Sequence, residues 1–459
     1  MGNHTTNFRS NLSWGVILGC FLLSMILLVL STSYAASFPG SVGFRLSSDS
    51  APSGPKGERL TSDHPDAMTK NEEEAEKKPL CDLTQRRTDV CDMVGDIRVH
   101  GNSSSVLFVT SSGLQEAYKI QPHPRKGDHA AMATVTQVIV KSTTFQEAPK
   151  CTIKSNVPAV IFSTGGYMFN FFHDISDALI PLYLSSHQFN GEVQFLIRDM
   201  LPWWVNKFEP LLKGLSNYEI IDLNQDHQVR CYSHVIVGIK YHGDLYIDPE
   251  KSGGLTMLDY GRYLRKSLGM KRETAIKLRP NDDKKPRVLI INRKGTRRFT
   301  NVDEMARMVE TSGFEAVVSE MHENKSLAEF AEVVNSCDVL LGLHGAGMTN
   351  LIFLPTNGIL IQIAPLGRME DVCWINYGAP AVRMKLHYLQ YSIRAPESNL
   401  IDQFPKDDPV ILDPLAVFQK QGSARWVSLY MHQQTVKLDV ERFRSVLWHS
   451  REIFRQPWN

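Results

Sequence analysis

Apolar runs of strand length alternate with helical patterns along most of the chain, and this alternation predicts an α/β fold. In the second half the strand-like runs occupy residues 288–291, 317–318, 339–343 and 359–363. A capping-box pattern from Ser326 to Glu329 opens one of the intervening helices. Strands and helices that alternate at this spacing are typical of a parallel sheet covered by helices.

The first half of the chain shows the same kind of pattern in shorter pieces. Strand-like runs lie at 159–162, 193–197 and 235–239, and a helical stretch follows the first of them. A polar and basic stretch at 275–286 separates the halves. We therefore predict two Rossmann-like domains that face each other across a cleft, the first spanning 81–280 and the second 281–459.

The N-terminal segment is unlike the rest. Residues 14–30 carry no charge, and with weakly polar residues up to 36 they form a helix of roughly 35 Å, enough to cross a bilayer core. Arg9, in the preceding tail 1–13, favours a cytosolic N-terminus. Residues 37–80 are rich in Pro, Gly, Ser and charge, as expected of a flexible stem.

A cleaved signal peptide is the alternative for this segment, since Ser33-Tyr34-Ala35 is a passable cleavage site. The apolar run is longer than the ~7–15 residues of a usual signal core, which favours a retained signal-anchor at 14–36. Either way, the remainder of the chain is expected in the secretory lumen.

Cysteine usage agrees with an oxidising compartment. Of seven cysteines, Cys20 lies in the membrane segment and the other six are widely and irregularly spaced, which suits disulfides better than zinc. Cys81 and Cys91 could close a short loop, while the other pairings stay open and free buried thiols are the alternative. Asn102 and Asn324 begin sequons and are possible glycosylation sites. The net charge of +1 gives no reason to expect a nucleic-acid partner.

The strongest chemical signal is the turn that follows the strand at 339–343. Glycines there allow a ligand to approach the backbone, and the exposed amides of a following helix would favour a phosphate. The alternative is a tight structural turn with a satisfied histidine. The predicted donor-binding residues of this turn are His344, Gly345, Ala346, Gly347 and Asn350.

A basic loop follows the first strand of the same predicted sheet. It contains Arg293, Arg297 and Arg298, whose planar guanidinium groups suit a diphosphate. A solvated basic loop is the alternative. There is no Asp-x-Asp motif of the kind that holds a metal-bound diphosphate, so arginines and helix amides would have to neutralise the diphosphate without an obligatory metal and without another cofactor.

A third signal lies in the first half, after Gly165-Gly166. His173 and Asp177 share a helix face at a spacing of four, with Asp174 beside them, and a histidine next to carboxylates is a natural general base. An ordinary ion pair on a helix is the alternative. Asp244 and Glu304 are the next candidates for the base.

Taken together and in order, these motifs resemble plant glycosyltransferase family 61, from about residue 80 to 450. The likeness rests on the block from Ser163 to Asp177, the basic loop with Arg293, and the run from His344 to Asn350. The block Cys81 to Cys91 and the run from Arg125 to Asp128 are similar to the xylan-decorating branch. One departure is Gln362, where many members carry a carboxylate.

This resemblance implies a GT-B-like fold of two domains and a Golgi membrane protein of single-pass type II topology. It implies an inverting transfer of xylose or arabinose from a UDP-pentose donor to a xylan acceptor, with Golgi glycosyltransferase complexes as possible partners. Two other readings remain: a non-catalytic lumenal glycan-binding or scaffold protein that keeps the fold, and an unrelated lumenal enzyme such as a sulfotransferase, which would bind adenosine phosphates.

Overall fold

The computed structural model describes residues 80–111, 117–280, 283–320 and 325–457. The predicted tail at 1–13, the predicted membrane segment at 14–36 and the stem up to residue 79 lie outside the described residues, as does the sequon at Asn324. Among the helices that are described, none combines the length and the apolar character needed to cross a bilayer.

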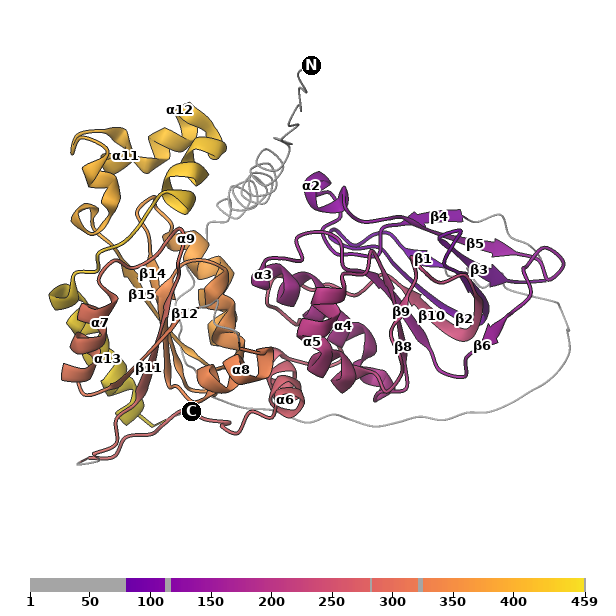
Figure 1. The fold of residues 1–459 in the computed structure, drawn as a ribbon, viewed down its shortest axis with the longest axis horizontal. Coiled ribbons are helices and arrows are strands. Elements are labelled where there is room, and N and C mark those ends of the chain that lie inside the picture. Colours follow the sequence, from indigo (N-terminus) through magenta and orange to yellow (C-terminus); the bar gives the residue numbers. More distant parts are fainter. Residues whose placement is uncertain (1–79, 112–116, 281–282, 321–324, 458–459) are drawn as a thin grey trace, which may run out of the picture.

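The described residues form two sheets with helices around them (Figure 1). The first sheet has ten strands in the described part of the chain, in the order β4-β5-β3-β2-β10-β7-β8-β9, with β1 paired to β2 and β6 paired to β10. Its strands are β1 (Cys81–Asp82), β2 (Val90–His100), β3 (Ser105–Val109), β4 (Ala117–Ile120), β5 (Val138–Thr143), β6 (Ile153–Lys154), β7 (Ala159–Ser163), β8 (Gln194–Arg198), β9 (Ile221–Asp222) and β10 (Val229–Val237). The helices of this half are α2 (His129–Met132), α3 (Phe171–His173), η1 (Asp174–Leu179), α4 (Ile180–Ser186), η2 (His187–Phe189), α5 (Pro202–Leu215) and α6 (Met257–Leu268).

The second sheet is parallel throughout its described strands, in the order β12-β11-β13-β14-β15. Its strands are β11 (Arg287–Asn292), β12 (Glu315–Glu320), β13 (Val339–Leu343), β14 (Ile359–Ala364) and β15 (His387–Ser392). The helices of this half are α7 (Val302–Thr311), α8 (Leu327–Asn335), η3 (Ala346–Phe353), α9 (Glu370–Cys373), η4 (Trp374–Gly378), α10 (Ala379–Arg383), η5 (Ala395–Glu397), η6 (Asn399–Asp402), α11 (Pro409–Leu412), α12 (Pro414–Val427), η7 (Ser428–His432) and α13 (Val440–Arg455).

Side-chain alternation explains how the second sheet is covered on both faces. Val288 and Ile290 of β11 point into a cluster with residues of α7 and α13. Leu289 and Ile291 point the other way, into a cluster that also holds residues of the first domain. Every residue of β13 and β14 is buried, as expected for parallel strands that have helices on each side.

The first domain departs from a purely parallel Rossmann-like sheet. The strands β6 to β10 run parallel, with α3 to α5 in the connections from β7 to β9, and β3 runs parallel to β5. β2 runs antiparallel to β10 and β3, and some of its residues are exposed to solvent, as antiparallel strands allow. The first sheet is therefore mixed, while the expected strand–helix alternation holds around β7.

Two helices also differ from the expected α form. The helix after the His344 turn, η3, is a 3-10 helix. The helix that carries His173 becomes a π-helix at η1 before it continues as α4. Single π-turns of this kind occur often at functional sites because they shift side chains relative to a regular helix.

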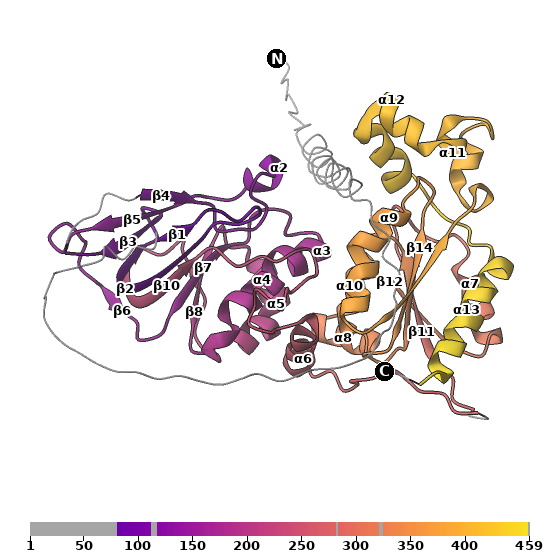
Figure 2. The ribbon, with the colours of Figure 1, turned by 180° about the vertical axis from the view of Figure 1, so that it is seen from behind.

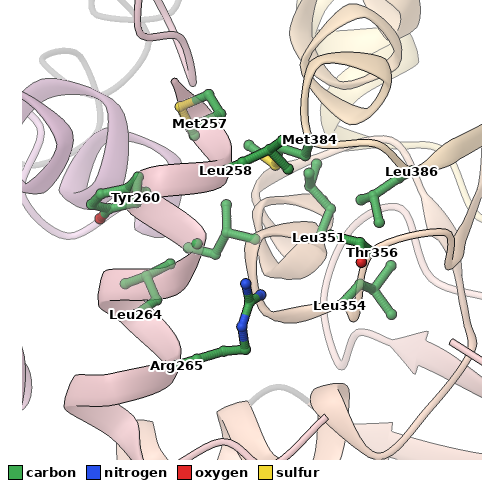
Figure 3. Close-up of a pocket in the computed structure, with 12 residues that line it drawn as sticks. Met257, Leu258, Tyr260, Leu264, Arg265, Leu351, Leu354, Thr356, Met384 and Leu386 are labelled. Carbon is green, nitrogen blue, oxygen red and sulfur yellow. The ribbon is translucent and has the colours of Figure 1, made fainter. Parts of the chain in front are cut away.

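The two halves are joined through α6, which lies between the sheets in both views (Figure 2). Tyr260 and Leu264 of α6 belong to the same buried cluster as Leu351 and Leu354 of the second half. Figure 3 shows a narrow, mainly apolar crevice between α6 and η3, into which Arg265 extends. This shared apolar contact fixes how the two domains face each other.

Two disulfides belong to the first domain, joining Cys81 to Cys91 and Cys151 to Cys231. The first pairs β1 with β2, and the second joins the segment before β6 to β10. Cys337 and Cys373 are buried free thiols. The short loop considered from the sequence thus forms. The described cysteines include both disulfide-bonded residues and free buried thiols.

We expect the Cys151–Cys231 disulfide to contribute more stability than the Cys81–Cys91 disulfide. It closes a loop of 80 residues rather than 10, and loop-closure entropy predicts losses of roughly 4 against roughly 2–3 kcal/mol. Urea unfolding of the full-length chain with each pair replaced by alanine measures both losses. An equal or larger loss for the short loop would contradict the entropic explanation.

Candidate functional site

The basic loop after β11 is held rigidly at the carboxyl edge of the second sheet. Asn292 accepts a hydrogen bond from the backbone N–H of Phe299 at 3.1 Å, and the backbone N–H of Arg297 donates to the carbonyl of Gln434 at 2.9 Å. Arg297 adopts a left-handed backbone conformation with φ of 52°. These constraints direct its side chain inward, where it is buried.

The turn after β13 lies directly against the same loop. The Arg297 Nη1 atom donates to the carbonyl of His344 at 3.2 Å. Gly345 has a φ of +147°, and a Cβ atom there would lie 2.8 Å from Arg293 Nη1 and 3.1 Å from Arg297 Nη1. The backbone conformation therefore favours glycine, and both guanidinium groups meet at this one residue.

The two arginines have no compensating carboxylate. Within the described residues neither Arg293 nor Arg297 forms an ion pair, and Arg293 Nη1 and Arg297 Nε are buried without a hydrogen-bond partner. Burial, together with the neighbouring Arg293 charge, lowers the pKa of Arg297 to about 9. Buried donors without acceptors are costly in a folded protein. The place where Arg293 and Arg297 meet Gly345, here called the arginine corner, therefore has the chemistry of an anion site.

His344 completes the corner as a neutral side chain. Burial first, and then the charges of Arg297 and Arg293, lower its pKa to about 3. Its Nδ1 atom lies 2.8 Å from the side-chain nitrogen of Gln362 on β14. The imidazole is thus held in one orientation at the carboxyl edge of the sheet.

The remaining residues predicted for the donor site have different positions. Arg298 is exposed. Asn350 is buried and donates to the carbonyl of Gly347 at 2.9 Å, so its amide braces η3. Ala346 and Gly347 form the first residues of η3.

A charged cluster in the first domain brings His173 and Asp177 together as expected. The His173 Nδ1 atom lies 2.8 Å from Asp177 Oδ2, which also accepts from Arg125 Nε at 2.8 Å. Burial alone would raise the pKa of Asp177, but the charges of Arg125 and His173 hold it well below its ordinary range. Arg125 Nη2 also lies 3.2 Å from Nδ1, but the contact with Asp177 is the shorter one. An ionised Asp177 can only accept, so the proton of a neutral His173 is assigned to Nδ1, which leaves Nε2 to accept a proton.

Arg125 organises this cluster and was not singled out from the sequence as a site residue. It is 4% exposed and contacts Asp177, Asp244 and the Nδ1 atom of His173. Its φ of 108° is unusual for a residue with a side chain and indicates a backbone held by its surroundings. Such contacts between residues far apart in the sequence leave no local pattern to find.

Asp244 joins this cluster, while Glu304 does not. Asp244 bonds to Arg125 and to the Tyr241 hydroxyl at 2.6 Å, and its side chain is 31% exposed. Glu304 lies on α7 and accepts from Asn301 at 2.8 Å. Figure 1 shows α7 on the face of the second sheet that is turned away from the first domain.

Asp174 points away from His173 and toward α5. It accepts from Trp204 Nε1 at 3.1 Å and from Lys207 Nζ at 3.2 Å, and it is fully buried. Burial raises its pKa to about 7, although Lys207 and Trp204 act in the opposite sense. These contacts give Asp174 a place in the packing of α5 against η1.

Aromatic contacts join the two clusters across the domain boundary. The ring of Phe172 lies 5.4 Å from His173 and 5.8 Å from Tyr377, and Tyr377 lies 5.7 Å from His344, centroid to centroid. Phe171 likewise contacts Phe353 of η3 at 6.3 Å. The helix that carries His173 therefore faces the arginine corner.

Two other predicted features complete the picture. Asn102 is exposed in the turn between β2 and β3, where its side-chain oxygen contacts His227 at 2.7 Å. In the described part of the chain, no three His, Cys, Asp or Glu side chains gather as a possible metal site.

The raised pKa of Asp174 predicts a pH-dependent stability. The folded pKa of about 7 exceeds the ordinary 3.8, so the folded state holds the proton more tightly and stability falls as pH rises from about 4 to 7. Asp174→Asn should remove this pH-dependent loss in the free energy of unfolding. The loss amounts to at most about 1.4 kcal/mol per pH unit within that window. Urea unfolding of both proteins across the window measures the difference, and a constant difference would contradict the assignment.

Comparison with known proteins places the chain among glycosyltransferases. The profile of the family described as Glycosyltransferase 61 matches residues 171–361. An alpha-1,3-arabinosyltransferase of Oryza sativa subsp. japonica is 44% identical over 378 residues, which are 82% of this chain and 64% of the relative. This chain therefore spans less than two thirds of that relative's length.

Two further relatives are covered more completely. A beta-1,2-xylosyltransferase of Oryza sativa subsp. japonica is 41% identical over 82% of this chain and 84% of its own length. A xylan glycosyltransferase of Arabidopsis thaliana is 36% identical over 81% of this chain and 79% of its own length. With identities of this size over most of both chains, the protein belongs to glycosyltransferase family 61.

Proposed function

We propose that this protein transfers a pentose, xylose or arabinose, from a UDP-sugar to xylan, with inversion at the anomeric carbon. The relatives named above support this proposal, since they are an arabinosyltransferase, a xylosyltransferase and a xylan glycosyltransferase. The observation that carries it is the pair formed by buried Arg297 and half-buried Arg293 at Gly345, which has no described carboxylate partner and faces the His173–Asp177 pair of the other domain.

The arginine corner would hold the diphosphate of the donor. Arg293 and Arg297 each offer buried N–H groups that lack acceptors, and guanidinium groups bind phosphate oxygens in pairs. Their charge neutralises the diphosphate as it leaves, so no metal is required for that task. A GT-B arrangement, with the donor bound on the second domain and the base on the first, would suit these two roles.

His173 would act as the base from the first domain. Its Nε2 atom accepts the proton of an acceptor hydroxyl while that oxygen bonds to the anomeric carbon and the bond to the diphosphate breaks. Asp177, held in place by Arg125, orients the imidazole ring and stabilises the positive charge that the ring gains. Attack from the side opposite the diphosphate inverts the anomeric centre, and UDP is released.

The cellular setting is part of the same proposal. A single membrane helix at 14–36, a stem and a lumenal catalytic region would make this a type II Golgi membrane protein with access to UDP-sugars and nascent xylan. Assembly with other Golgi glycosyltransferases is a further element of this setting.

The function is tested by offering the full-length chain UDP-xylose and UDP-arabinose with xylo-oligosaccharides, with and without a chelator. We expect one pentose added per acceptor, identified by mass spectrometry, and stabilisation by UDP rather than adenosine phosphates in thermal unfolding. Transfer that depends absolutely on Mn²⁺ or Mg²⁺ would contradict the metal-free donor site. UDP binding without any transfer would favour a glycan-binding role.

Arg293→Ala should weaken donor use. A hydrogen bond to a charged group contributes ~1.5–3 kcal/mol, so the KM for the donor should rise by roughly one to two orders of magnitude. Arg307→Ala, at an exposed position on α7, serves as the matched control. An unchanged donor KM in Arg293→Ala, with normal folding, would remove Arg293 from the donor site.

His173→Ala and Asp177→Asn should lower kcat while UDP affinity is retained. Loss of a general base costs typically ~10²–10⁴-fold in rate, and Asp177→Asn should also shift the pH profile because it no longer holds the proton on Nδ1. His227→Ala, an exposed histidine of the same domain, is the control. If both variants turn over at the wild-type rate, the base lies elsewhere, with Asp244 the next to test.

A further inference from the structure

Gln362 occupies a fully buried position on β14, next to the imidazole of His344. Its side-chain nitrogen lies 2.8 Å from His344 Nδ1. The Tyr388 hydroxyl lies 3.0 Å from its side-chain oxygen and 2.6 Å from the side-chain oxygen of Gln390, so its one proton serves two acceptors. The Gln362 amide is placed with its nitrogen toward the histidine and its oxygen toward Tyr388.

This contact decides where the imidazole carries its proton. An amide nitrogen only donates, so Nδ1 of His344 must be the bare, accepting nitrogen. The single proton of the neutral ring then lies on Nε2. No described residue forms a hydrogen bond with Nε2, and the ring lies beside Tyr377 and close enough to Arg293 and Arg297 to feel both charges.

The surroundings of the ring oppose a second proton. The charged and titratable groups near it are Arg293, Arg297 and Tyr377, with Cys373 and His432 close to Arg297. No described acidic side chain contacts the ring. Burial and the two guanidinium charges lower the pKa of His344 to about 3, so the ring stays neutral at any ordinary pH.

We propose that Gln362 is a positioning residue of the donor site, which holds His344 as a neutral Nε2–H donor toward the diphosphate. This inference rests on the proposed function, because the diphosphate is the ligand that the ring would meet. A neutral donor adds a hydrogen bond without adding a third cation to two arginines that already repel each other. Because the ring stays neutral, the hydrogen bond from Nε2–H to the diphosphate would also be independent of the protonation of His344.

A carboxylate at position 362 would reverse this arrangement. It can only accept, so it would draw the imidazole proton to Nδ1 and leave Nε2 bare, facing an anion. At lower pH the ring would gain a second proton and again offer an Nε2–H group. Donor binding would then weaken as pH rises through the raised pKa of the ring.

The proton position can be measured without any nucleotide. Nitrogen-15 NMR of the full-length chain labelled at histidine, with His344→Gln to identify the signals, reports which ring nitrogen carries hydrogen. We expect a neutral Nε2–H ring that does not titrate between about pH 5.5 and 8, although a free histidine titrates there. A ring that titrates in this range, or one protonated on Nδ1, would overturn the proposal.

The consequence for binding is measured with UDP and two matched variants. Gln362→Glu should bind UDP about tenfold or more weakly than wild type at the upper end of this range, with the ratio of the two dissociation constants shrinking toward the lower end. Gln419→Glu makes the same change at an exposed position on α12, away from Tyr388 and His344. Its ratio to wild type should not vary with pH. Parallel pH profiles for Gln362→Glu and wild type would overturn the proposal.

The two measurements separate this inference from the proposed function. If wild type binds no UDP, the proposed donor site fails, and the proton position in His344 still decides the role of Gln362. If wild type binds UDP and transfers pentose while His344 titrates, the function holds and the role of Gln362 is wrong.

Discussion

Two guanidinium groups meet at Gly345 in the second domain, with no carboxylate of the described residues paired to them, and the other features of the site depend on this uncompensated charge. Burying a cation costs several kcal/mol unless it is paired. The cost is tolerated because the loop after β11 is held by backbone bonds, such as that from Arg297 to Gln434, which keep the Arg297 side chain directed inward. A charge kept ready in this way needs no rearrangement when an anion arrives.

The first domain handles a buried arginine in the opposite way. Arg125 is compensated by Asp177 and Asp244, so it has no charge to offer a ligand. It serves instead to keep Asp177 ionised and thereby to set the proton of His173. The same residue type thus has a structural task in one domain and a proposed binding task in the other, and the difference lies in the carboxylates around it.

The domain contact brings these two electrostatic environments into one site. Phe172 and Tyr377 lie between His173 and His344, and a single apolar cluster extends through both domains. Because buried apolar contacts of this extent are close-packed, the core sets the distance between His173 and the arginines at Gly345.

Local patterns in the sequence determined much of the fold. The strand runs at 159–162, 339–343 and 359–363 became β7, β13 and β14, because burial between helices selects apolar residues along the whole strand. The capping box at Ser326 formed as expected. The basic loop and the His344 turn were also identified from the sequence, since both follow buried strands at the edge where ligands of parallel sheets bind.

Only the tertiary structure decided which of these residues act together. Arg125 meets Asp177 across 52 positions of sequence, and Gln362 meets His344 across 18. Asp174 has the same local sequence context as Asp177 but bonds to α5, and Arg298 beside Arg297 is exposed. Sequence spacing fixes the period of an element and the face a residue shares. The partner of a buried charge depends on how elements pack, and that is a property of the folded chain alone.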